Sequence, residues 1–454
     1  MQKRWLLSAI LAGALMLLLS GCLFQSTDEL YALPQPPEDF RSLQTQLDDV
    51  LKTGAEYAAP LRGSNTQPVQ LVDLDGDGIQ EAVAFFRVPT DEEPMKIYIY
   101  SQNDAQEYVL QSKIEGSGTA INAVAYEDLD GYKNQNGYCD KELVINWQIS
   151  NLVYTLGAYS VRGDSVNEMM LTRYTDYAIC DIDQDGQKEI IVLYVDTVED
   201  NSLAQLFDYD GAAMALSSTA PMSKDITGIT ARRTAYLQNS VPALFVTSGV
   251  SSGGAVTDIF AYKNDELSNI TLNQETGRSD CTYRLNTSIA GQDINGDGVL
   301  ELPKPTALPE YQKSSSADNF WSVLWQQYDL NGTSYDIFRT YYNGDGGWYF
   351  ILPESWKGCI TVSRRDVLSG ERAVVFSYWT GDENTTPKSF LTIYELTGIN
   401  RESRATLNRR FILKRESDTI YCAEFTQNSW QCGLNETDAV SRFNLIQPDW
   451  TSRG

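Results

Sequence analysis

Three short loops of this sequence carry the same pattern of acidic residues. Val72–Phe86 reads VDLDGDGIQEAVAFF, and two later segments read DIDQDGQKE and DINGDGVLE. In each loop, side chains that offer oxygen occupy positions 1, 3, 5 and 9, and glycine occupies position 6. Crowded carboxylates repel one another unless a hard cation lies between them, and Ca²⁺ takes about six to eight oxygen ligands. The predicted calcium ligands are Asp73, Asp75, Asp77 and Glu81, then Asp181, Asp183, Asp185 and Glu189, then Asp293, Asn295, Asp297 and Glu301, with the position 7 carbonyls of Ile79, Gln187 and Val299.

The segments that follow the loops distinguish them from EF-hands. An EF-hand loop needs a bidentate Glu at position 12, whereas that position here is Ala84, Val192 or Lys304. The segments EAVAFF and EIIVLYV are short, apolar and rich in β-branched or aromatic residues, which is typical of strands. We therefore expect calcium-binding loops that join strands.

The composition excludes several classes of function. A chain of 454 residues has room for two or three domains. Its formal net charge of −26 argues against nucleic acid as a partner, because nucleic-acid sites need clustered Lys and Arg. The absence of histidine excludes Ser-His-Asp and Cys-His nucleophilic sites and zinc catalysis at HExxH motifs. Glycosidase chemistry that uses two carboxylates remains open.

Residues 1–22 have the features of an export signal. Lys3 and Arg4 precede the apolar run Trp5–Leu19, whose 15 residues are fewer than the about 20 that a membrane-spanning helix needs. The ending Leu-Ser-Gly-Cys22 resembles the lipobox of bacterial lipoproteins, which implies that Cys22 is lipidated. We expect an extracytoplasmic protein anchored to the membrane through Cys22, followed by a tether and an amphipathic helix within residues 23–59.

The acidic loops recur at a regular interval. Candidate loops begin at Asp73, Asp128, Asp181 and Asp293, an interval of about 53–56 residues if one copy is missing from the series. The missing copy is expected near residue 236, where a turn at Gln238–Ser240 precedes the apolar segment ALFV. Each unit has four short apolar segments, and this period is typical of a β-propeller. The predicted fold is mainly β, with a propeller of about five four-stranded blades over residues 60–345.

These units resemble the FG-GAP/VCBS repeats of calcium-binding propellers related to the integrin alpha-subunit head. In that family the loop joins the first two strands of a blade, and calcium makes it rigid, so the resemblance implies the same role for the three acidic loops. The second unit departs from the pattern, because a long insertion separates Asp128 and Asp130 from Glu142. The fourth unit carries no acids and is expected to bind no ion.

Three further features of the sequence lie outside the acidic loops. Residues 346–454 alternate apolar segments with turns and are expected to form a separate small α+β domain. The six cysteines after Cys22 could form disulfides in an exported chain, for example between Cys422 and Cys432, or could remain free. The tetrapeptide Arg162–Ser165, RGDS, suggests integrin binding, but a strand on each side favours an ordinary hairpin turn.

The function that these observations favour is binding rather than catalysis. We expect a surface-anchored, calcium-stabilised binding or scaffolding module, with a protein or glycan ligand in the cell envelope and no enzymatic activity. The alternative is a carbohydrate-active enzyme of the envelope, with a carboxylate pair at the mouth of the propeller. Such a pair would lie outside the loops, with its carboxylates about 5–10 Å apart in one cleft.

Overall fold

The computed structural model describes residues 40–446, except residues 135, 312–319, 383, 408 and 429. The predicted signal segment, Cys22 and the tether before residue 40 lie outside this range. Within it, no helix has both the length and the apolar character needed to cross a membrane.

The described residues form mainly β structure, which confirms the predicted class, in a series of antiparallel sheets. The first sheet contains β1 (Glu56–Tyr57), β2 (Val69–Val72), β3 (Glu81–Arg87), β4 (Met95–Gln102) and β5 (Tyr108–Gly116). The second contains β6 (Ala120–Glu127), β7 (Glu142–Gln148), β8 (Tyr154–Arg162) and β9 (Ser165–Arg173). The third contains β10 (Asp176–Cys180), β11 (Glu189–Tyr194), β12 (Leu203–Tyr209) and β13 (Met214–Pro221).

The next sheets continue the series toward the C-terminus. The fourth contains β14 (Ile226–Leu237), β15 (Val241–Val250), β16 (Ala255–Lys263) and β17 (Glu266–Asn269). The fifth contains β18 (Leu302–Ala307), β19 (Trp321–Tyr328), β20 (Ser334–Asn343), β21 (Trp348–Ile351) and β27 (Phe443–Leu445). The sixth contains β22 (Ile360–Leu368), β23 (Glu371–Tyr378), β24 (Lys388–Thr397), β26 (Thr419–Phe425) and β25 (Phe411–Arg415). The α-helices are α3 (Arg41–Lys52), α4 (Arg401–Ala405) and α5 (Glu436–Arg442), and the 3₁₀ turns are η2 (Gln238–Ser240), η3 (Asp280–Thr282) and η4 (Glu354–Trp356).

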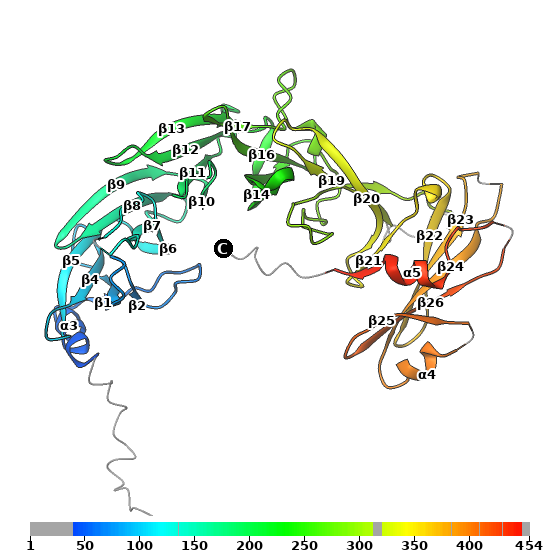
Figure 1. Ribbon diagram of the computed structural model, residues 1–454, viewed down its shortest axis with the longest axis horizontal. Helices are drawn as coiled ribbons and strands as arrows, with labels where there is room; N and C mark the ends of the chain where they lie inside the picture. The colour runs from blue at the N-terminus through cyan, green and yellow to red at the C-terminus, as the bar shows by residue number, and fades with distance from the viewer. Residues whose placement is uncertain are drawn as a thin grey trace, which may run out of the picture.

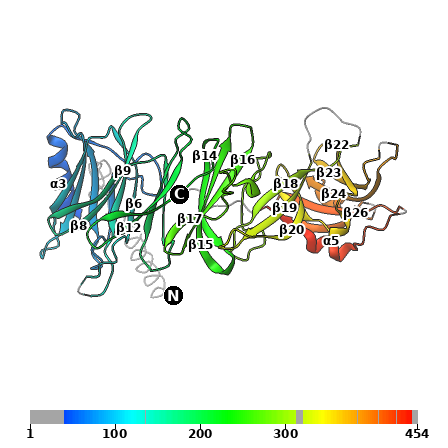
Figure 2. The ribbon, with the colours of Figure 1, turned by 90° about the horizontal axis from the view of Figure 1, so that it is seen from above.

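The first five sheets follow one another along an arc. In the second and third sheets, the first strand lies toward the concave side of the arc and the fourth toward the convex side (Figure 1). Neighbouring sheets touch through their last strands, β5 with β9, β9 with β13, and β13 with β17. The first and fifth sheets lie at opposite ends of the arc in both views (Figures 1 and 2), so the arrangement in this structure is an open arc.

The sheets stack face to face, and their second strands show why. In β7, Leu143 and Ile145 pack in a core shared with the first sheet, whereas Val144 packs in a core shared with the third. Successive side chains of a strand point to opposite faces, so a strand between two neighbouring sheets needs apolar residues throughout. In β11, likewise, Ile190 faces the second sheet and Ile191 the fourth. The uninterrupted apolar runs of the sequence are therefore strands buried on both faces.

Helix α3 covers the free face of the first sheet, as the spacing of its apolar residues predicts. Leu43 and Leu47 are buried against Ala82, Ala84 and Phe86 of β3. The ring of Phe40 stacks on that of Tyr108 with a centroid separation of 6.1 Å. The helix thus protects an apolar face that would otherwise be exposed to solvent.

The repeat prediction is confirmed at the positions that it named. The acidic loops that begin at Asp73 and Asp181 join β2 to β3 and β10 to β11, and η2 joins β14 to β15 in the unit without acids. The last loop differs, because the strand before it is reduced to one bridge between Gln292 and Glu301. Its loop is closed by that bridge and leads directly into β18.

The fifth and sixth sheets share a hydrophobic core across the predicted domain boundary at residue 345. Tyr341 and Phe350 of the fifth sheet pack in one cluster with Val362 and Phe376 of the sixth. Strand β27 then returns from the sixth sheet to pair with β21. The six cysteines of the described residues are free, and Cys422 is buried.

Candidate metal centres

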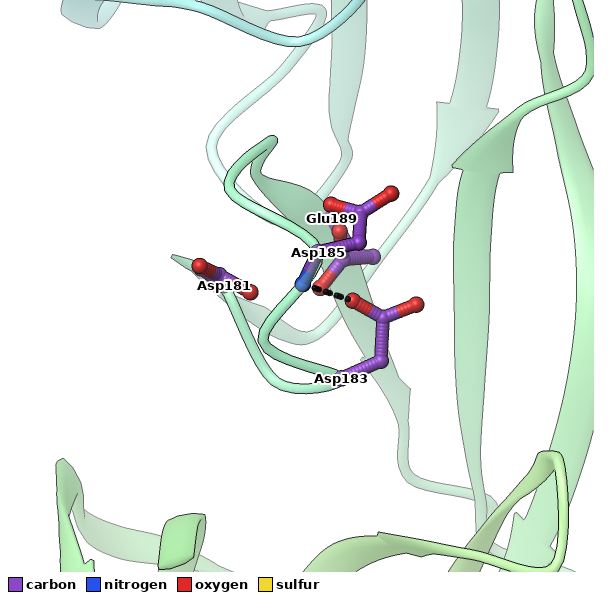
Figure 3. Close-up of side chains that lie close together, drawn as sticks. All are labelled: Asp181, Asp183, Asp185 and Glu189. Atoms are coloured by element: carbon purple, nitrogen blue, oxygen red, sulfur yellow. Dashed lines mark hydrogen bonds between the residues drawn. The ribbon is translucent and has the colours of Figure 1, made fainter.

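The acidic loops bring their carboxylates together as the pattern predicts. In the loop after β10, carboxylate oxygens of Asp181, Asp183, Asp185 and Glu189 lie within 4.8 Å of one another. Figure 3 shows these four side chains gathered around the loop. The first loop gathers Asp73, Asp75 and Glu81, and the last loop gathers Asp293, Asp297 and Glu301, each set within the same distance. Asp77 lies outside the closest group of its loop.

One set of backbone hydrogen bonds shapes all three loops. The Glu at position 9 accepts a hydrogen bond from the backbone N–H of position 2, at 2.7 Å for Glu81, 2.7 Å for Glu189 and 2.9 Å for Glu301. The Asp at position 1 accepts one from the glycine at position 6, at 2.9–3.2 Å. Gly78 has φ of +88°, in the left-handed region that glycine adopts without steric strain. The spacing therefore encodes the loop conformation as well as its charges.

The residues at position 7 are held by the same network. The backbone N–H groups of Ile79, Gln187 and Val299 donate to the Asp at position 5, at 2.6, 2.8 and 2.9 Å. The residue at position 3 in turn accepts from the N–H of position 5, as Asp75 and Asp183 do at 3.1 Å. Each loop is thus ordered by its own side chains, and the position 7 carbonyls are the further oxygens that the sequence predicts as ligands.

Buried carboxylate oxygens in two of these loops lack any hydrogen-bond donor among the described residues. They are Oδ1 of Asp73, Oδ1 of Asp181 and Oε1 of Glu189. Buried polar atoms in folded proteins are nearly always paired, because desolvation without a partner costs about 1–3 kcal/mol or more for a charged group. Oxygen-only donors, clustered and unpaired, fit a hard cation such as Ca²⁺.

The electrostatics of the position 9 carboxyls lead to the same conclusion. The pKa of Glu189 is raised to about 8, mainly by burial and also by the nearby Asp183, Asp208 and Asp181, against the lowering effect of the hydrogen bond from Ile182. Burial likewise raises the pKa of Glu81 to about 7. An ionised carboxylate is therefore unfavourable at these positions in the protein alone, and a bound cation would favour it.

The second unit also assembles its acids, although the insertion in its loop made this site doubtful from sequence. Oxygens of Asp128, Asp130 and Glu142 lie within 4.8 Å of one another, and Glu142 Oε2 accepts from Leu129 N at 2.9 Å. The guanidinium of Arg162 lies at this cluster, since Nη2 is 2.6 Å from Asp130 Oδ2. A side-chain cation thus lies beside the carboxylates of this cluster.

The contacts of Arg162 extend beyond Asp130. Its Nε is 3.0 Å from Asp140 Oδ2, its Nη2 is 3.9 Å from Glu142 Oε1, and its guanidinium lies 4.1 Å from the ring centroid of Tyr132. Arg162 is the first residue of the RGDS tetrapeptide, whose Gly163 and Asp164 form the turn between β8 and β9. The hairpin prediction is confirmed, and the arginine faces the loop of its own sheet.

An amide group lies against the carboxylates of the last loop. Gln327 Nε2 donates to Asp297 Oδ2 and to Glu301 Oε1, both at 2.7 Å. The oxygen and nitrogen of a glutamine amide are assigned from such networks, and rotation of the amide would present Oε1 to a cation instead. Sequence reasoning missed the contacts of Gln327 and Arg162 with the acidic clusters, because both residues lie far along the chain from the loops that they contact.

Hydrogen bonds also link each loop to the preceding unit. Lys141 N donates to Leu74 O at 2.7 Å, and Lys188 N donates to Asp128 O at 3.2 Å. Leu300 N donates to Tyr236 O at 3.0 Å in the same way. Because Lys188 and Leu300 directly precede the position 9 carboxylates of their loops, an ion that orders either loop also orders the contact between adjacent sheets.

A cavity lined by residues of the fourth and fifth sheets gives no support to a carboxylate-pair enzyme. It has a volume of about 710 Å³ and is lined by β14, β15, residues 284–292 and the start of β18. No Asp or Glu is among its lining residues in the described part of the chain. The paired acids that glycoside hydrolysis needs are absent from this lining.

Comparisons with known proteins do not assign the chain to a family. No protein-family model matches it, and no curated protein matches it either. Among solved structures, MPT-4, a mannose phosphorylase from Leishmania mexicana, has 8% identity and a TM-score of 0.17, and the match covers 75% of this chain and 90% of that one. MPT-1, a GDP-Man-dependent mannosyltransferase from the same organism, has 10% identity and a TM-score of 0.15, with 75% and 92% covered. Similarity at this level supports no conclusion about activity.

Proposed function

We propose that this chain is a calcium-stabilised binding or scaffolding module of the cell envelope. Its first five sheets are, in this proposal, blades of the propeller type in an open arc. The observation that carries the proposal is the set of buried, donor-free oxygens of Asp73, Asp181 and Glu189 inside preformed acidic loops. Carboxylates in this state need a counter-ion, and Ca²⁺ matches both their chemistry and their flexible loop geometry.

Calcium has a structural role in this proposal. The ion would be held by the side chains at positions 1, 3, 5 and 9 of each intact loop, with the position 7 carbonyl. An ordered loop then fixes the hydrogen bond to the preceding sheet, as Lys188 N to Asp128 O illustrates. The arc would become a rigid surface for a protein or glycan ligand, and the chemistry of the ligand would be independent of the ion.

The stoichiometry of calcium binding tests this proposal. Titration of the chelator-treated chain, followed by calorimetry, should give three ions per chain, with the last loop weakest because Gln327 must rotate. Asp73→Asn and Asp181→Asn should each remove one ion. Asp128→Asn is the matched control and should remove none, because the guanidinium of Arg162 already lies at that cluster. Equal stoichiometry in the wild type and Asp73→Asn would contradict the proposal.

The proposed cellular location of the protein rests on its N-terminal motif. We propose that Cys22 carries a lipid anchor and that the module is extracytoplasmic, where calcium is available to weak sites. Cys22→Ala should move the protein from the detergent-rich to the aqueous phase in detergent phase separation. Cys432→Ala is the control and should leave partitioning unchanged. A Cys22→Ala chain that still enters the detergent phase would rule out the lipobox interpretation.

A further inference from the structure

The cavity of about 710 Å³ differs in charge from the rest of the molecule. The chain has 61 acidic and 35 basic residues, yet Arg232, Arg233 and Arg284 line this cavity and no carboxylate does. Arg232 Nε is paired with Asp176 Oδ1 at 2.6 Å, and Arg233 Nη1 donates to Gly291 O at 3.3 Å. Arg232 and Arg233 are partly exposed, whereas Arg284 is buried, so Arg284 is the residue to explain.

Arg284 is a buried cation that pairs with no carboxylate in the described part of the chain. Only 6% of the residue is exposed, Nη1 donates to Thr257 Oγ1 at 2.9 Å, and Nε has no acceptor. Burial lowers the pKa of its guanidinium, but arginine stays protonated in proteins. A buried charge that is neither paired nor neutralised is unfavourable, so its retention at a cavity wall indicates an anionic ligand.

Hydrogen bonds fix the backbone of Arg284, and the hydrogen bond to Thr257 Oγ1 fixes one end of its guanidinium. Arg284 and Ala255 exchange two hydrogen bonds, each of 2.9 Å. Gly254 packs so closely that a Cβ there would lie 2.5 Å from Arg284 O, and its φ is +85°. Thr257 Oγ1 is in turn bonded to Thr247 Oγ1 at 2.9 Å. The arginine is therefore preorganised, which lowers the entropic cost of binding a ligand.

We propose that this cavity binds a small molecule that carries a single negative charge on a carboxylate, with the Arg284 guanidinium as its counter-ion. A planar guanidinium fork matches a carboxylate, and the single charge of the buried Arg284 matches one negative charge better than a phosphate dianion. Thr230, Thr287 and Ser288 line the cavity together with Phe245 and Leu302, and this mixed lining suits a ligand with both polar and apolar surface, such as a sugar acid.

This inference rests on the binding role proposed above and names the class of ligand. Arg284 lies outside the acidic loops, so its test is separate from the test of calcium binding. The test is calorimetric titration of the calcium-loaded full chain with D-glucuronate, acetate, inorganic phosphate and, as a neutral match, D-glucose. D-Glucuronate should bind, acetate should compete with it, and D-glucose should give no heat. Arg284→Met should weaken glucuronate binding at least tenfold without lowering the melting midpoint, because an unpaired buried charge is removed.

Controls separate this proposal from the others. Arg284→Gln should lose binding in the same way, while Arg173→Gln, which changes an exposed arginine of β9, should bind as the wild type does. Three results would each overturn it, even where the calcium stoichiometry holds. Glucuronate could bind no better than glucose, both Arg284 variants could retain binding, or Arg284→Met could lower the melting midpoint. Ile446 also lines the cavity. If a chain truncated after Ile446 bound glucuronate and the full chain did not, the proposal would be overturned, and the site would be assigned to the chain's own last residues.

Discussion

In excess chelator, the melting midpoint of this protein should fall well below its value in millimolar calcium. Calcium binds the ordered loops and hardly the unfolded chain, so each site adds RT ln(1 + [Ca²⁺]/Kd), about 2.7 kcal/mol at a hundredfold excess over Kd. Sites of this extracellular type commonly have Kd values of about 10⁻⁴–10⁻³ M. The loss in chelator should be largest for the loops whose oxygens have no other partner, those of Asp73 and Asp181.

Variants of single loops make this expectation specific. Asp73→Asn and Asp181→Asn should each remove one site's share of the calcium effect, and the double variant should lose both shares, because the loops belong to different sheets. Thermal unfolding of each variant in chelator and in calcium measures the effect. Magnesium is the control ion, since it demands near-octahedral geometry and releases water reluctantly. A midpoint that calcium does not raise, or that magnesium raises equally, would contradict the structural role of calcium.

Arg162→Ala should destabilise the protein by about 3 kcal/mol, because it leaves buried carboxylates without their cation. The side chains of Asp130, Asp140 and Glu142 are only 2, 5 and 1% exposed, whereas that of Arg162 is 40% exposed, which places the loss at the lower end of the range for buried pairs. Calcium should restore part of the stability by entering the vacated cluster. Chemical denaturation in chelator and in calcium measures both effects.

We also expect Arg162→Ala to change the number of calcium ions that the protein binds. With Arg162 absent, the cluster of Asp128, Asp130 and Glu142 resembles the intact loops, so the number of bound calcium ions should rise by one. Arg173→Ala, at an exposed position of β9, is the matched control and should change neither stability nor stoichiometry. A loss below about 1 kcal/mol in Arg162→Ala would show that the guanidinium is a surface contact, which contributes little.

Local pattern was sufficient to predict the acidic loops. The nine residues from position 1 to position 9 carry both the carboxylates and the backbone hydrogen bonds that order them, as Asp73 with Gly78 shows. The same holds for the strands, since EAVAFF and EIIVLYV are apolar throughout and form β3 and β11. It also holds for α3, because Leu43 and Leu47 fall on one helical face. In each case the signal lies within a few residues.

The charge state of each cluster and the shape of the arc were decided by contacts that are distant in sequence. Arg162 reaches Asp130 from 32 positions away, and Gln327 reaches Asp297 from 30. Arg284 meets Thr257 across 27 positions and lies at a cavity whose walls span two sheets. A repeat period specifies that similar units follow one another, but the angle between them depends on the side chains packed between sheets, so the period alone could not distinguish a ring from an open arc.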